Sequence, residues 1–84
     1  MATTTEIIEN VRVKDPSWLA SIEDYNSGGD PKFTVWLLRV DYHVKKVAGF
    51  GFLDLEDVDL AGMFEGEVTP REAARTVLTN SEVF

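Results

Sequence analysis

His43 is the only histidine in the chain and the first side chain to consider for catalysis. A histidine acts as a general base when a nucleophile and an orienting acid lie beside it. The sequence places neither group, and His43 falls at the margin of an apolar helical stripe, next to Lys45 and Lys46. A half-buried structural histidine explains the pattern better. No catalytic residue is assigned, and the chain is predicted not to be an enzyme.

The acidic run Asp54–Asp59 could supply carboxylate oxygens to a hard cation such as Ca²⁺. Aligned from Asp57, the calcium-loop template finds Asp59 and Gly62 in place. Ala61, however, stands at a ligand position, and Val68 stands where the closing Glu is required. Helix capping by Asp54 and solvated surface charge explain the run, so no metal site is predicted.

Gly49-Phe-Gly-Phe52 contains a Gly-x-Gly pattern, but no further Gly-x-x-Gly spacing or preceding strand supports a phosphate-binding loop. Glycines that turn the chain between two helices are sufficient, and no cofactor is predicted. The chain also lacks cysteine, which excludes disulfides, thiolate catalysis and cysteine zinc sites.

The composition fits one small globular domain. The chain has 84 residues, 44% of them hydrophobic, and no apolar run approaches the ~18 residues needed to span a membrane. The first ten residues lack the basic start and apolar core of a signal peptide, which favours a cytoplasmic location. The net charge of −7 repels phosphate backbones and disfavours direct binding of nucleic acid.

Negative charge is concentrated in one stretch, because no Lys or Arg occurs between Lys46 and Arg71. A solvated face that aids solubility is one interpretation. An acidic docking surface, or a mimic of DNA phosphates, is the other. The candidate acidic face consists of Asp54, Glu56, Asp57, Asp59, Glu65 and Glu67.

The longest apolar segment predicts a central helix at about 31–48, opened by Asp30-Pro31 and stopped by Gly49. Its β-branched content also permits a strand, but the cap, the length and the helical periodicity favour the helix. One stripe should face the core: Phe33, Trp36, Leu37, Val40, Val44, Val47 and Ala48.

The opposite side of this helix also carries apolar residues, flanked by cations. If exposed, they would form an interface with another protein or a second copy of the chain. Alternatively, the N-terminal segment or the helix at 16–26 covers them. The candidate interface consists of Val35, Leu38, Arg39, Tyr42 and Lys46.

Capping patterns predict the other elements. Asp15-Pro16 should open a helix at 16–26, and Thr69-Pro70 should open one at 70–79. A short helix is expected at about 56–65, ended by Gly66. Residues 1–14 form a flexible arm that orders on a partner or a short helix at about 4–11, and 15–84 form a single helical domain. The predicted fold is all-α, a compact bundle of four to five short helices around the central one.

A longer series of residues comprises Trp36-Leu37-x-x-Val40-Asp41, Gly49, Leu53-x-Leu55-x-Asp57, Phe64 and Thr69-Pro-x-Glu72-Ala73-Ala74. This series resembles a family of small uncharacterised helical proteins found in phage and bacterial genomes. The resemblance spans about residues 36–74 and implies a helical fold and a possible phage source, but no activity. Gly66 lies one residue earlier than the family's usual turn glycine.

Together these features predict a small acidic interaction module, in line with a phage accessory protein that binds a host or phage protein. One alternative is an acidic decoy that inhibits a nucleic-acid-binding protein. Another is a structural protein that self-assembles, beginning with a homodimer. No particular partner follows from the sequence.

Overall fold

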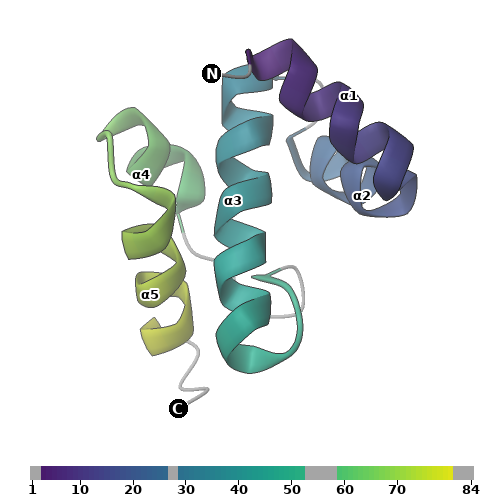
Figure 1. Cartoon of the computed structure of the whole chain (residues 1–84). Coiled ribbons are helices and arrows are strands. Elements are labelled where there is room, and N and C mark those ends of the chain that lie inside the picture. Colours follow the sequence, from purple (N-terminus) through teal and green to yellow (C-terminus); the bar gives the residue numbers. More distant parts are fainter. Residues whose placement is uncertain (1–2, 27–28, 53–58, 81–84) are drawn as a thin grey trace. The chain divides into compact units, whose positions relative to one another are not determined.

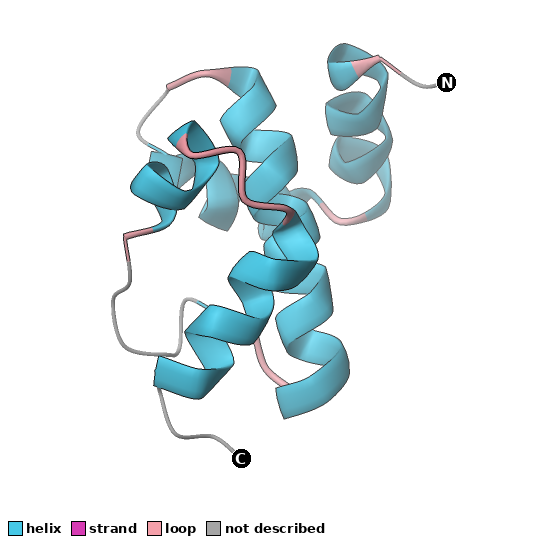
Figure 2. Cartoon of the chain, turned by 90° about the vertical axis from the view of Figure 1, so that its left-hand side faces the viewer, coloured by secondary structure: helices cyan, strands magenta, loops and turns pink. Residues whose placement is uncertain are grey.

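The computed structural model describes residues 3–26, 29–52 and 59–80. Within these ranges the chain forms five helices and no strand, which confirms the all-α class (Figures 1 and 2). In the same ranges, no helix has both the length and the apolar character needed to cross a bilayer. The helices are α1 (Thr4–Lys14), α2 (Pro16–Asn26), α3 (Pro31–Ala48), α4 (Leu60–Glu65) and α5 (Pro70–Asn80).

Side-chain caps explain why these helices begin where they do. Asp15 Oδ1 accepts a hydrogen bond from the Trp18 amide at 3.1 Å, and Thr69 Oγ1 accepts one from the Glu72 amide at 3.2 Å. Thr3 caps α1 in the same way. Each cap satisfies an amide that has no partner inside its helix. The predicted starts of α2, α3 and α5 are therefore confirmed, whereas α1 extends further than the predicted 4–11.

The helix expected at about 56–65 starts later. Asp59 is the N-cap of α4, and its Oδ1 accepts the Gly62 amide at 2.9 Å, so the helix begins at Leu60. The cap proposed at Asp54 lies outside the described residues. Gly66 is the C-cap, as predicted, although the residue in the left-handed region is Glu67, with φ 62°.

The chain divides into two compact units, Met1–Leu38 and Arg39–Phe84, and α3 runs from the first into the second. In the first unit, α1 packs on α2. Arg12 on α1 lies 3.8 Å from the Glu23 carboxylate on α2. The Asn26 amide donates to the Thr34 hydroxyl at 2.8 Å, which fastens the end of α2 to the start of α3.

The second unit contains the end of α3 together with α4 and α5. There α5 lies alongside α3, and the two run in the same direction (Figure 1). Ala73 and Ala74 are buried on α5, and small residues of this kind permit close approach of helices. The buried apolar side chains of this unit are Val40, Val44, Phe52, Leu60, Ala73, Ala74, Val77 and Leu78.

A return turn after α3 depends on two glycines and a buried carboxylate. Gly49 adopts φ 83°, a left-handed conformation that glycine tolerates best. The Phe52 amide then donates to Asp41 Oδ1 at 2.8 Å. A Cβ atom at Gly51 would collide with the same carboxylate. Phe52 is buried beneath this turn, whereas Phe50 is 39% exposed.

Candidate functional site

Two residues of the predicted interface lie in the interior. Val35 is 8% exposed and Leu38 is 3% exposed, so neither contributes to an exposed apolar patch. That prediction was wrong for these two side chains, and the alternative of burial within the chain holds for them. Periodicity shows that a side chain favours burial, but it does not show whether its own chain or a partner covers it.

The other three predicted interface residues are exposed. Tyr42 is 53% exposed, and Arg39 and Lys46 also face solvent. The Lys46 ammonium lies 5.2 Å from the centre of the Tyr42 ring, within the range of a cation–π contact. The Tyr42 ring also meets the His43 ring edge-on, with centroids 5.7 Å apart. Tyr42 therefore lies beside His43 and Lys46. His43 and Lys46 in turn line a groove on the surface.

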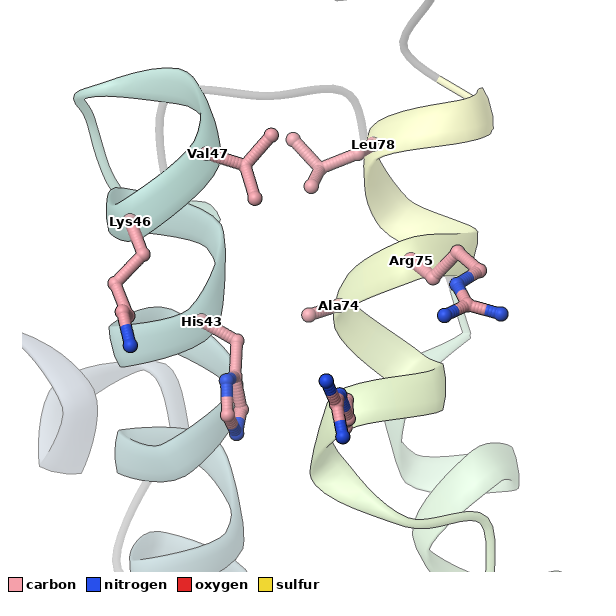
Figure 3. Close-up of a pocket in the computed structure, with 7 residues that line it drawn as sticks. His43, Lys46, Val47, Ala74, Arg75 and Leu78 are labelled. Carbon is pink, nitrogen blue, oxygen red and sulfur yellow. The ribbon is translucent and has the colours of Figure 1, made fainter.

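This α3–α5 groove has a volume of about 310 Å³. Val47 and Leu78 point toward one another across it, and His43 lies opposite Ala74 (Figure 3). Lys46 and Arg75 extend along its outer margins (Figure 3). The residues that line it are His43, Lys46 and Val47 from α3 and Arg71, Ala74, Arg75 and Leu78 from α5.

The groove combines an apolar floor with positive margins. Val47 was predicted to lie in the core, yet it is 58% exposed. It adds exposed apolar surface to the floor of the groove, and Leu78 on the other side of the floor is buried. Lys46, Arg71 and Arg75 line the groove, and among the described residues no Asp or Glu does. This distribution is unusual in a chain with fifteen acidic residues and eight basic ones. The groove is suited to bind a group that carries both apolar surface and negative charge.

His43 is half-buried, as its position in the sequence suggested. It lines the groove among cationic side chains. A general base for acyl or phosphoryl transfer would be oriented by an acidic or polar partner. In this position His43 adds a ring surface and a ring nitrogen to the wall of the groove.

The candidate acidic face is only partly described. Glu65 and Glu67 are exposed, and Asp59 is occupied as the cap of α4. Among residues 3–26, 29–52 and 59–80, no group of three or more potential ligands could hold a metal ion. The other members of this face, Asp54, Glu56 and Asp57, lie outside the described residues.

A second depression lies between α1 and α2 in the first unit, with a volume of about 230 Å³. Apolar side chains dominate it, and its charged residues are one cation and one anion, Lys14 and Asp15. This depression therefore offers apolar surface to a ligand, and its lining favours neither a positive nor a negative charge on that ligand. The other lining residues are Ile7, Asn10, Val11 and Trp18.

Sequence reasoning missed the contribution of α5 to the groove. Arg71 and Arg75 were not among the candidate residues, although they are four positions apart and so share one side of a helix. The alignment of α5 beside α3 brings them next to Lys46 and Val47. The spacing alone was visible in the sequence, but the pairing of these two helices was not.

No protein-family model, curated protein or solved structure matches this chain.

Proposed function

We propose that this chain is a non-enzymatic protein-interaction module and that its docking surface is the α3–α5 groove together with Tyr42. The groove itself carries the proposal, because the exposed Val47 side chain is flanked there by cations. Protein interfaces combine an apolar centre with a polar rim, and Tyr and Arg are frequent among the residues that dominate their energetics. A partner would bury the exposed faces of Val47 and Tyr42.

The resemblance to small helical proteins of phage and bacterial genomes extends this proposal. In that setting the chain acts as a phage accessory protein, in the cytoplasm, on a host or phage protein. Its mode of action is to occupy a surface of that protein rather than to transform a substrate.

The proposal is tested by capturing partners from a bacterial lysate on the tagged protein. Tyr42→Ala and Val47→Ser should each lower the yield of a specific partner by about tenfold, because each removes apolar contact area at the centre of the surface. Both side chains are largely exposed, so the helical circular dichroism and the unfolding midpoint should hardly change.

Tyr25→Ala is the matched control, since Tyr25 is a 38% exposed tyrosine on α2 and lies outside the groove. It should leave capture intact. Equal capture by the parent protein and by both groove variants would count against the α3–α5 groove as the docking surface.

The two alternative functions predict different results. A decoy that imitates phosphates would lose its partner when Asp59, Glu65 and Glu67 are neutralised, and would tolerate the groove variants. A self-assembling protein would show the mass of a dimer or larger species by light scattering at both low and high salt. In that case Tyr42→Ala would restore the monomer.

A further inference from the structure

The cations on α5 lack acidic partners. Among the residues that the structure describes, neither Arg71 nor Arg75 forms an ion pair. They lie four residues apart on one helix, where two like charges repel each other. The Lys46 ammonium on α3 lies over the Tyr42 ring. The groove therefore gathers positive charge that the described chain does not neutralise.

Two other cations of the protein, one in each unit, have acidic partners. Arg12 lies 2.6 Å from Glu9 and 3.8 Å from Glu23, and Lys45 lies 3.2 Å from Asp41. Acidic side chains are thus placed beside cations elsewhere in both units. In the part of the chain that the structure describes, no Asp or Glu lines the groove, which leaves a site complementary to an external anion.

The floor limits what that anion can be. Its apolar members, Val47, Ala74 and Leu78, are aliphatic, and the ring in the lining is the imidazole of His43. A volume of about 310 Å³ is at the low end of the ~300–1,000 Å³ typical of ligand sites. It suits a single apolar anchor with charged neighbours.

We infer that the occupant of the groove is a peptide segment of another protein in which Asp or Glu residues flank an apolar anchor side chain. The inference rests on the proposed function, because it gives the chemistry of the partner at the same surface. The anchor lies on Val47 and Leu78, and the flanking carboxylates pair with Arg71, Arg75 and Lys46. Arginine binds carboxylates in a bidentate geometry, which favours carboxylates placed on both sides of the anchor.

The overall charge distinguishes this occupant from two others. At −7, the chain repels nucleic acid and a second copy of itself at long range. A short acidic segment on a less acidic protein avoids most of that repulsion, because charges are screened beyond about 8 Å at physiological salt. Within the groove the local cations then dominate.

The test is a selection of short random peptides on the intact protein, followed by affinity measurements on the enriched peptides. Asp and Glu should be enriched around a Leu, Ile or Phe anchor, and affinity should fall as salt is raised. The double variant Arg71→Gln/Arg75→Gln should weaken binding roughly tenfold or more, with an unchanged helical circular dichroism spectrum.

Lys14→Gln/Lys32→Gln is the matched control. It removes the same charge from exposed positions that do not line the groove, so it reports the effect of net charge alone. Binding of the acidic peptides should change by less than about twofold. Equal weakening by both double variants would overturn the assignment of these peptides to the groove.

Neutral or basic peptides that bind and are lost on Val47→Ser would overturn the acidic partner but leave the proposed docking surface standing. Failure to enrich any peptide sensitive to Arg71 and Arg75 would also overturn the inference, whereas the capture experiment separately judges the proposed function. The inference is equally wrong if a labelled single-stranded oligonucleotide displaces the peptides from the groove. It is also wrong if light scattering shows a dimer that the double arginine variant dissociates.

Discussion

Asp41 and one wall of the α3–α5 groove lie on the same helix, α3. The charged side chains of these two regions differ in whether they have partners within the chain. The Asp41 side chain is 3% exposed, and its oxygens are held by the Phe52 amide and the Lys45 ammonium. The cations of the groove face solvent without ion-pair partners among the described residues. A charge whose partners come from its own chain stabilises the fold, whereas a charge without them remains able to bind a ligand.

The contrast extends to two consecutive lysines. Lys45 pairs with Asp41 one helical turn earlier, while Lys46 lies over Tyr42 and lines the groove. Because successive residues on a helix project about 100° apart, two neighbours of the same type can serve different surfaces. Substitutions on the two sides of this comparison should separate stability from binding.

Phe52→Ala should have the largest effect. The side chain is 5% exposed and closes the return turn over Asp41, so its truncation is expected to lower the free energy of unfolding by about 3–5 kcal/mol. Urea unfolding followed by circular dichroism measures this loss. Phe50→Ala is the control, with a smaller expected loss of about 1–2 kcal/mol because Phe50 is 39% exposed. Similar losses for both would show that the turn does not pack as described.

Asp41→Ala should cause the next largest loss of stability. Removing the carboxylate leaves the buried Phe52 amide without its acceptor, which costs about 1–3 kcal/mol. Asp41→Asn retains an oxygen at that place and loses mainly the contact with Lys45. It should therefore be the milder variant in the same urea titration. If the asparagine variant is as unstable as the alanine variant, the ion pair rather than the amide hydrogen bond is the main contribution.

Lys45→Ala and Lys46→Ala should have smaller effects on stability than Asp41→Ala, and the two should differ from each other. Lys45 is 45% exposed, so its loss should lower stability by no more than about 1 kcal/mol, and Lys46→Ala should fall within about 0.5 kcal/mol of the parent. Binding of acidic peptides should show the reverse order, because Lys46 lines the groove and Lys45 does not. Equal effects on both properties would remove the distinction between the paired and unpaired lysine.

Arg75→Gln should have the smallest effect on stability, and its sign should be favourable. It relieves the repulsion with Arg71 on the same face of α5, which is worth about 0.2–0.5 kcal/mol at low salt. A thermal melt at low and high salt would reveal the gain and its disappearance by screening. A clear loss of stability would mean instead that Arg75 has a structural role within the fold.

The surface was only partly predictable. Tyr42 and Lys46 were predicted to lie at an interface because they lie on the side of α3 opposite the predicted core stripe, and both are exposed. Val35 and Leu38 were assigned to the same patch, yet they are buried. Val47 shows the opposite error, since its periodicity placed it in the core but the structure leaves it exposed. Near the end of a helix, neighbouring segments decide burial, and their positions are not encoded in its periodicity.

The sequence by itself determined the all-α class and most helix boundaries. Caps such as Asp15 and Thr69 act on amides three residues away, so their effect is contained in a short stretch of chain. Only the tertiary structure placed α5 beside α3 and so assembled the groove from Lys46, Arg71 and Arg75. That pairing depends on the packing of side chains from segments far apart in the sequence, and no local pattern specifies it.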